Sequence, residues 1–548
     1  MATPASHSSV SEKTHTDIAV PGTRAPMSGD FERGYALGRD SNVELLRLRS
    51  PSASSRLNLQ VADHHHEHEH EYTGSSPVTQ YARELYDSAV SRERVFWDRL
   101  RGKGKRKVGW GESLKNALMS SWLNILLLAI PLAWVAHFLQ DTEHSWGHNT
   151  VFSLCFTAII PLEALFDWGG EQMAIYLGKT IGDLLIVTLN NAVETALAII
   201  LLAHCELRLL QSTIVGVVIL HLLLVPGVAF LAGGARVWEQ TLHPHHTQLN
   251  HSLLTIGILS ILLPTAFFAA LDRGPVSIAA SGNANFEGST LITDKTRQNV
   301  LAMSRGFAII LKIVYVASRV YLSNPPGEDN ALKHMSALPE ELKEAEDELN
   351  EIEPAINPLA CFLMLCLTVG LTGATAEWLV ESIEHVREEG HIQEEWFGLI
   401  LLPVVSFAAD GMVALVYFFK SALLHILGKK AMVPSLLARA RAIDLSIQFT
   451  LWWMPFLVLL GWILDNPMIL LFDFYELSLL LGSCFLVNYI TADSKTNWVE
   501  GLILVAFYIM IAVSAWFYVG QPELQIMLSC PDSVASAIVA EVAGGGGE

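Results

Sequence analysis

Four carboxylates interrupt the long apolar segments of this sequence, and they are the residues best suited to do chemistry. Glu171 and Glu194 lie in two neighbouring segments of the first half, and Glu377 and Asp410 lie in two neighbouring segments of the second half. A carboxylate at the centre of a bilayer costs about 2.5–3.5 kcal/mol on insertion scales, so such acids usually mark an ion path, a proton relay or a pair with a buried cation. Four acids at matching places therefore predict a site for cations or protons.

Membrane-spanning helices are the elements that must position these acids. Hydrophobic residues make up 51% of the chain and charged residues 16%, and about 20 apolar residues at 1.5 Å each cross the hydrocarbon core. The apolar runs lack the alternation of a barrel, and only helices or closed barrels satisfy their own backbone in lipid. We therefore expect an all-α polytopic membrane protein with about eleven transmembrane helices. The expected spans are residues 114–138, 150–168, 181–203, 210–233, 252–271, 301–322, 357–382, 395–419, 442–464, 468–490 and 498–519.

Basic residues set the expected orientation of these spans. Six Lys and Arg residues between positions 99 and 107 precede the first span and place the N-terminus in the cytosol. Residues 520–548 contain neither Lys nor Arg, as a translocated tail should, and this agrees with an odd number of spans. The expected organisation is a disordered cytosolic tail with a His/Glu tract at 1–110, the first span and first repeat at 111–322, a cytosolic acidic helix or linker at 323–356, the second repeat at 357–520 and a lumenal tail at 521–548.

The acids also point to an internal repeat, in which spans two to six correspond to spans seven to eleven. Small residues stand beside each acid, as in Asn190–Glu194 and Ser406–Asp410, and they permit close helix approach and exposed backbone carbonyls. Two halves with interrupted helices at equivalent positions predict inverted repeats and a binding site near the bilayer midplane. Carboxylate, amide and carbonyl oxygens are the ligands that Ca²⁺ prefers.

Other features of the composition bear on what the chain does not do. The formal net charge of −20 argues against nucleic-acid binding, and we find no nucleotide loop, no sign of covalent catalysis and no cofactor motif, so we do not expect an enzyme. Residues 63–71 form a His/Glu tract that could bind Zn²⁺ or another transition metal weakly, but the tract has no fixed geometry and lies in a tail expected to be disordered, so a functional metal role is not favoured. Five of the six cysteines lie in or beside apolar spans, lack metal-ligand spacing and are interpreted as small apolar residues, and no disulfide framework is visible.

Several motifs resemble the vacuolar calcium/proton exchanger family, of which the chain looks like a divergent, fungal-type member. The family carries Gly-Asn-Ala-[Val/Ala]-Glu in its third and eighth spans, and Asn191-Ala192-Val193-Glu194 matches four of those five positions. The resemblance covers about residues 110–520. Further similar segments are Ile130–Trp134, Glu206–Arg208, Gly398–Pro403, Ser446–Gln448 and Asn497–Gly501.

The resemblance implies alternating access driven by a proton gradient. Glu194 and Asp410 would bind the cation when ionised and carry protons when it leaves, and Asn191 and Gln448 would supply neutral oxygens. Glu171 and Glu377 would gate the path or relay protons. The substrates would be Ca²⁺ and H⁺, and the protein would lie in the lipid bilayer of the vacuolar membrane or of another endomembrane.

The sequence also departs from the family pattern. The second motif has Ser406 and Phe407 for Gly-Asn and Asp410 for glutamate, and span four has His221 at the end of a stretch that lacks the family's small polar residues. In span nine, Asp444 replaces a glycine. Two alternatives therefore stay open, which are a monovalent cation/proton exchanger and a transport-inactive paralogue that acts as a membrane scaffold or regulator.

Span six adds basic residues to the membrane region. Arg305, Lys312 and Arg319 are spaced by seven, which puts them on one helix face. Lys312 lies mid-span, where an unpaired ammonium is expensive. We expect it to pair with Asp410 or, more readily, with Asp444. The alternative is that Lys312 reaches a lipid-facing or water-filled edge by snorkelling.

Overall fold

The structure is a computed structural model that describes residues 96–139, 147–234, 240–241, 244–271, 293–323, 351–409, 411, 416 and 441–530. The His/Glu tract, most of the acidic linker, Asp410 and residues 531–548 lie outside the described residues.

The first half is a series of helices that follow the apolar runs. A short amphipathic helix precedes them, and two of the later helices are interrupted. The elements are α2 (Trp110–Leu118), the 3-10 helix η1 (Trp122–Leu128), α3 (Ala129–Phe138), α4 (His148–Leu177), α5 (Lys179–Leu189), α6 (Ala192–Ala203), α7 (Leu207–Ile219), the π-helical turn η2 (Leu220–Leu224), α8 (Val225–Gly234), β1 (Gln240–Thr241), α9 (Pro244–Leu271) and α10 (Asp294–Ser323).

The second half repeats this plan, and its helix starts have clear local causes. At α12 the Asn357 side chain accepts a hydrogen bond from the Leu359 amide next to Pro358, and at α18 Asn497 and Glu500 form a capping box. The elements are α12 (Pro358–Gly390), α13 (Glu394–Trp396), the π-helical turn η4 (Phe397–Leu401), α15 (Arg441–Gln448), the π-helical turn η5 (Phe449–Trp453), α16 (Met454–Ile463), α17 (Phe474–Ile490), β2 (Lys495–Thr496), α18 (Trp498–Ala515) and α19 (Pro522–Leu528).

These helices confirm the all-α membrane fold. Within the described residues, seven helices are long and apolar enough to cross a membrane, or nine if each of two bent helix pairs is one span. The helix α17 is apolar but shorter, and the expected span 395–419 runs beyond residue 409 into residues that are not described. Each expected span has a helix at its position, but the structure does not establish the number eleven.

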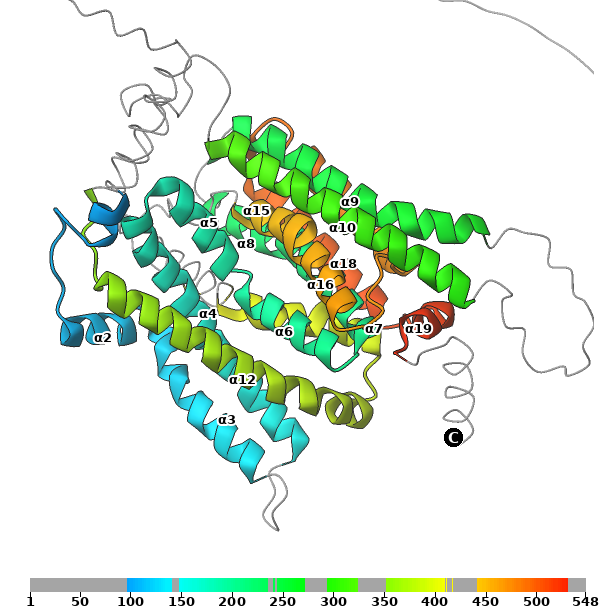
Figure 1. Ribbon diagram of the computed structural model, residues 1–548, viewed down its shortest axis with the longest axis horizontal. Coiled ribbons are helices and arrows are strands. Elements are labelled where there is room, and N and C mark those ends of the chain that lie inside the picture. The colour runs from blue at the N-terminus through cyan, green and yellow to red at the C-terminus, as the bar shows by residue number, and fades with distance from the viewer. Residues whose placement is uncertain are drawn as a thin grey trace, which may run out of the picture. The chain divides into compact units, whose positions relative to one another are not determined.

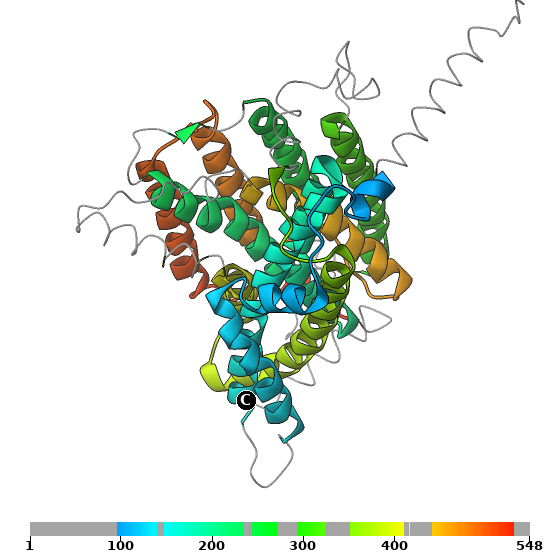
Figure 2. The same cartoon turned by 90° about the vertical axis from the view of Figure 1, so that its left-hand side faces the viewer.

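The first expected span is not a single straight helix. The helix α2 meets the continuous stretch Trp122–Phe138 at 94°, and Figure 2 shows this blue segment lying across the end of the bundle. Trp110 and Leu114 on α2 are exposed, although both are large and apolar. An apolar face beside basic residues is typical of a helix that lies along a membrane surface. The first expected span is therefore bent, and residues 122–138 are its continuous helical part.

Helix contacts repeat between the two halves. The helices α4 and α12, which are equivalent, pack side by side (Figure 1), as do α9 and α17. The contact of α7 with η4 has its counterpart in the contact of α15 with α5, and α8 with α18 has its counterpart in α16 with α10. If each helix is replaced by its equivalent in the other half, every one of these contacts becomes its counterpart. This is the contact pattern expected of two structural repeats.

The two ends of α12 are joined to different parts of the chain. At its start, the Asn116 side chain donates to the Ala355 carbonyl and the Ser113 hydroxyl accepts from the Asn357 amide, so residues 351–357 dock onto α2. Beyond its other end, Arg208 of α7 contacts Glu395 of α13 at 2.5 Å. The short β1–β2 pair, antiparallel, joins the loop before α9 to the loop before α18 (Figure 2).

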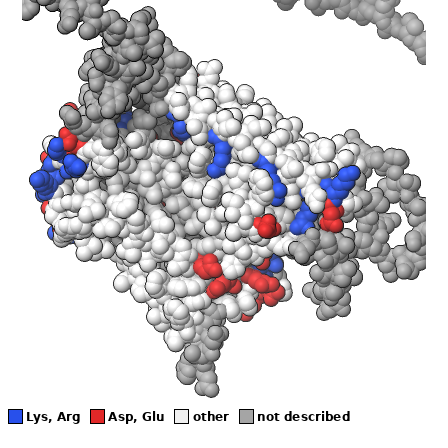
Figure 3. All heavy atoms as spheres, viewed as in Figure 1, with Lys and Arg blue, Asp and Glu red and all other residues white. Residues whose placement is uncertain are grey.

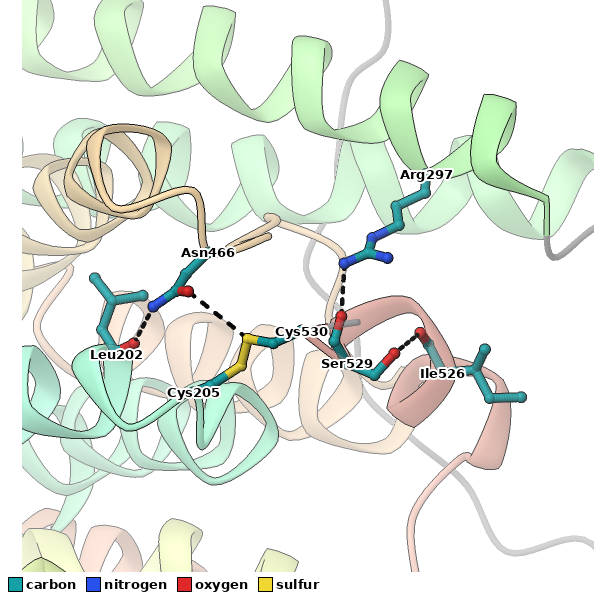
Figure 4. Close-up of a disulfide and its surroundings, with 7 residues drawn as sticks. All are labelled: Leu202, Cys205, Arg297, Asn466, Ile526, Ser529 and Cys530. Atoms are coloured by element: carbon teal, nitrogen blue, oxygen red, sulfur yellow. Dashed lines mark hydrogen bonds between the residues drawn. A yellow bond between two sulfur atoms is a disulfide. The ribbon is translucent and has the colours of Figure 1, made fainter. Parts of the chain in front are cut away.

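The cysteine interpretation is wrong for one pair, because Cys205 and Cys530 form a disulfide across 325 residues (Figure 4). Two side-chain donors hold the chain beside this bond: Arg297 donates to the Ser529 carbonyl at 2.6 Å, and Asn466 donates to the Leu202 carbonyl at 2.6 Å. Sequence spacing gave no sign of the bond because the fold alone brings the loop after α6 to the segment after α19.

That segment has a second anchor. Arg208 also donates to the Gln521 carbonyl at 2.8 Å, and the Gln521 amide donates to Asp473 at 3.1 Å. We call residues 520–530 the C-terminal strap, because these contacts and the disulfide tie it to helix ends from both halves.

Candidate cation-binding site

The break in the third expected span lies at Asn190 and Asn191, inside the best-preserved motif. The helices α5 and α6 meet there at 53°. Asparagine weakens helices because its side chain competes for backbone hydrogen bonds. Glu194 consequently falls in the first turn of α6, where the positive end of the helix dipole favours a carboxylate.

Asn191 and Gln448 meet across the two halves of the protein. The Asn191 amide donates to the Gln448 Oε1 atom at 2.8 Å, and the Gln448 amide donates to the Thr188 hydroxyl at 2.9 Å. Both residues are buried, with 0% and 1% exposure. The Asn191 Oδ1 atom is buried without a hydrogen-bond partner in the described residues. The two amides predicted as neutral ligands are therefore neighbours, and one amide oxygen is available to a ligand.

His221 lies beside the Glu194 carboxylate. Its Nε2 atom is 3.7 Å from Glu194 Oε1, and the two side chains are 5% and 2% exposed. His221 belongs to the π-helical turn η2, and such turns inside α-helices are frequent at functional sites. Sequence analysis noted His221 only as a departure from the family pattern, so its place in the site is a finding of the structure.

A small pocket surrounds this pair and contains a second acid, Glu163, which lies in the middle of α4 and is 5% exposed. The sequence offered a signal for Glu163, an acid inside the apolar run 150–168, but sequence analysis weighed only four acids and missed it. The pocket is lined by Glu163, Asn190, Glu194, His221, Val225, Ser406, Phe407 and Leu445.

Residues of the second half form one wall of the pocket, and close helix packing holds this wall in place. Ser406 and Phe407 continue the helix that begins at η4, and Asp410 follows them outside the described residues. The turn η4 crosses α7 so closely that a Cβ atom on Gly216 would collide with the Leu399 carbonyl. Glycine at position 216 is therefore required for the two halves to meet beside the site.

The acids predicted as gates or relays lie away from this pocket. Glu171 is half-buried on α4 and does not line it. Glu377 on α12 contacts His204 Nε2 at 2.7 Å, and its side chain is 40% exposed. Figure 3 shows acidic side chains gathered near the end of α12. The relay role of both acids stays a prediction.

The expected pair of Lys312 with Asp444 is wrong. Asp444 Oδ1 lies 3.6 Å from Arg319, whereas the Lys312 ammonium stacks over the Trp452 ring, 4.1 Å from its centroid, and over Phe456 at 5.0 Å. Along a helix, seven residues span about 10.5 Å, so Lys312 lies two turns away from Arg319, the residue that contacts Asp444. Aromatic faces stabilise the Lys312 ammonium.

The three basic residues do share a face of α10, as their spacing predicted. Arg305 completes the series over Trp462, 4.7 Å from the ring centroid. Figure 3 shows a row of basic side chains along the line of α10. The row faces the aromatic side chains of η5 and α16, and Lys312 does not line the pocket.

The pocket presents the carboxylates of Glu163 and Glu194, the imidazole of His221 and the amide of Asn190. The carboxylates and the imidazole are buried, and groups of these kinds can exchange protons and bind cations. In the part of the chain that the structure describes, no three His, Cys, Asp or Glu side chains are grouped so as to hold a metal ion. A site that binds and releases its ion during transport does not need a complete set of ligands around the ion in every conformation.

Comparisons with known proteins agree with this geometry. The family described as sodium/calcium exchanger protein matches residues 147–323 and 360–517. A vacuolar calcium ion transporter of Cryptococcus neoformans var. grubii is 32% identical, covering 78% of this chain and 79% of the relative. One of Schizosaccharomyces pombe is 33% identical, covering 74% and 87%, and a Ca²⁺/H⁺ antiporter of Aphanothece halophytica is 32% identical, covering 73% and 97%.

Among solved structures, native YfkE superposes with a TM-score of 0.53 at 22% identity, and the match covers 72% of this chain and 100% of that one. This likeness concerns the fold, and the sequence matches carry the family. With both halves of the sequence matched and relatives above 30% identity over most of their length, the chain belongs to the sodium/calcium exchanger protein family.

Proposed function

We propose that this protein is a proton-coupled cation antiporter that moves Ca²⁺ from the cytosol into an acidic organelle, at the vacuolar membrane. The observation that carries the proposal is a buried carboxylate, Glu194, at a helix break where amide side chains from both halves meet. Relatives at 32–33% identity are named as vacuolar calcium ion transporters and a Ca²⁺/H⁺ antiporter, and these names support the substrate and the compartment.

The proposed cycle uses Glu194 as the group that exchanges a cation for a proton. When ionised, its carboxylate binds the cation together with amide oxygens of Asn190 and Asn191. When the site opens to an acidic lumen, protonation removes the negative charge and the cation leaves. Movement of one repeat against the other exposes the site alternately to the two sides. Asp410 would act in the same way from the second half.

The position of Lys312 bears on the monovalent alternative. A fixed ammonium at the site could replace part of the transported charge and would favour the monovalent alternative. Lys312 lies over aromatic rings and is not among the described residues that line the pocket, which weighs against such a role. Divalent exchange is therefore the better supported reading.

Uptake into proteoliposomes under an imposed pH gradient, acidic inside, tests the proposal. We expect Ca²⁺ uptake that depends on the gradient and exceeds uptake of Na⁺ or K⁺. Glu194→Gln should reduce uptake to background. Glu388→Gln, which changes an exposed acid near the end of α12, is the matched control and should leave uptake unchanged. Uptake of Na⁺ or K⁺ alone would replace the proposal with monovalent exchange, and no uptake of any cation would favour a scaffold.

A further inference from the structure

The described chain begins with a basic and apolar surface that does not line the cation-binding pocket. Seven Lys and Arg residues lie between positions 99 and 115, and the surrounding stretch 96–119 contains two acids, Asp98 and Glu112. Figure 3 shows basic side chains gathered at the left edge of the molecule, where Figure 1 places α2. We call residues 96–119 the N-terminal surface segment.

The helix α2 in this segment carries an exposed apolar stripe. Trp110, Leu114 and Leu118 are four residues apart, which puts them on one face of the helix, and they are 57%, 64% and 53% exposed. Another face of α2 is buried against the protein at Ser113 and Ala117. An exposed apolar stripe beside charged residues is typical of a surface that contacts a membrane or another protein.

Hydrogen bonds hold this stripe in a fixed orientation. Residues 351–357 dock onto α2, and the Lys105 ammonium adds a hydrogen bond to the Ile352 carbonyl at 2.9 Å. Tyr176 of α4 donates to the Ile356 carbonyl at 2.7 Å, so the same residues are also tied to α4. The helix α2 lies at 94° to the helical stretch that follows it. If that stretch crosses the bilayer, α2 lies near the plane of the bilayer surface.

The charge of the segment indicates which partner fits this surface. An interfacial helix with Trp or Leu on one face and basic residues beside it binds a bilayer by apolar burial and by attraction to anionic lipids. Clusters of about four to eight Lys or Arg residues next to a membrane span are typical of segments that bind anionic headgroups. The two acids pair with Lys103 and Arg106, and the basic residues outnumber them. Arg101 and Lys107 are exposed.

We propose that the N-terminal surface segment is a docking surface for anionic phospholipids of the bilayer in which the protein lies. Its basic side chains bind the headgroup phosphates, and its apolar stripe enters the boundary between headgroups and acyl chains. The stripe distinguishes a lipid from a free phosphate, because only the lipid offers acyl chains beside its charge. The proposal does not depend on which ion the protein transports.

Thermal unfolding of the full chain in mixed micelles tests the proposal. Phosphatidylserine added to a neutral detergent should raise Tm, because a ligand of the folded state stabilises it, and phosphatidylcholine should raise Tm much less. We define the half-rise as the mole fraction of phosphatidylserine that gives half of the full rise in Tm. In the double variant Arg101→Gln, Lys107→Gln the half-rise should increase by about tenfold or more, since each basic residue near an anionic surface contributes about fivefold in affinity.

Two further variants separate charge from apolar contact. The double variant Lys295→Gln, Lys495→Gln is the matched control, because it removes two exposed basic residues outside the segment, and it should keep the wild-type half-rise. Leu114→Gln retains every charge but interrupts the apolar stripe, so its half-rise should also increase. Inorganic phosphate, which offers charge without acyl chains, should leave the Tm of the wild type unchanged.

Three results would overturn the proposal. The first is a wild type that phosphatidylserine stabilises no more than phosphatidylcholine or inorganic phosphate does. The second is an unchanged half-rise in a folded Arg101→Gln, Lys107→Gln variant. The third is a variant of this kind with a lower Tm before lipid is added and a wild-type response to lipid, which would mean that the basic side chains hold the acidic linker at 323–356 instead. If the double variant does not fold, Leu114→Gln and the wild-type preference for phosphatidylserine decide the proposal.

Discussion

At the residue scale, the site contains buried amides from both halves, and Asn191 donates a hydrogen bond to Gln448. Sequence analysis assigned these two residues to one site, and their side chains are neighbours in the structure. It missed His221 and Glu163, since nothing in their spacing shows that η2 and the middle of α4 converge on Glu194. It also paired Lys312 with the wrong neighbour, because a shared helix face does not determine the register against another helix.

Gln448→Leu tests the contact between the halves. The variant removes the 2.8 Å acceptor of the Asn191 amide, which then donates only to the carbonyls of Val187 at 3.2 Å and Leu445 at 3.5 Å. The net loss of one hydrogen bond costs about 0.5–1.5 kcal/mol. We expect a raised KM for the transported cation, measured by uptake at graded concentrations. Thr188→Val removes only the outer partner of Gln448 and should have the smaller effect. Equal KM values in the wild type and Gln448→Leu would contradict the role of this contact.

At the element scale, breaks and π-helical turns within the helices position the functional groups. The break between α5 and α6 and the π-helical turns η2, η4 and η5 all lie in the helices that meet around the pocket. Sequence analysis expected interrupted helices because of the Asn pair and the neighbouring small residues. Sequence analysis did not predict the π-helical turns. One extra residue in a turn of an apolar helix does not change the hydrophobic composition from which the helix was predicted.

Gly216→Ala tests the close approach of α7 and η4. The added methyl would meet the Leu399 carbonyl, and overpacking of this kind typically costs about 1–3 kcal/mol. We expect a lower Tm and weaker transport. Gly373→Ala is the control, because nothing lies within 4 Å of a Cβ at that helical position, so its Tm should stay the same or rise. A Tm for Gly216→Ala as high as that of the control would show that α7 can move away from η4 without loss.

The C-terminal strap gives a second prediction at this scale. Cys530→Ser removes the disulfide to Cys205, and native disulfides typically contribute about 2–4 kcal/mol. Under oxidising conditions we expect a lower Tm than in the wild type, and a reducing agent should lower the wild-type Tm but leave that of the variant unchanged. Cys366→Ser, at an exposed free cysteine, is the control. A variant whose Tm equals that of the control would mean that the hydrogen bonds alone hold the strap.

At the scale of the whole molecule, two related halves meet around one pocket. Hydropathy predicted the helices, and the paired acids predicted the repeat. The helix contacts that recur between equivalent elements of the two halves agree with a repeat. The disulfide joins the loop after α6 to the segment after α19, and both are expected on the lumenal side if the chain begins in the cytosol. Disulfides persist in oxidising compartments, so this bond supports the proposed orientation with an odd number of spans.

Coupling of calcium to protons through Glu194 is the central claim, and a pH-sensitive dye trapped inside proteoliposomes tests it most directly. When Ca²⁺ is added outside acid-loaded vesicles, we predict that the interior becomes more alkaline as protons leave in exchange. In Glu194→Gln the dye signal should not respond to Ca²⁺, while Glu388→Gln should respond as the wild type does. Calcium entry without a change in internal pH, or a Glu194→Gln variant that responds like the wild type, would contradict the account.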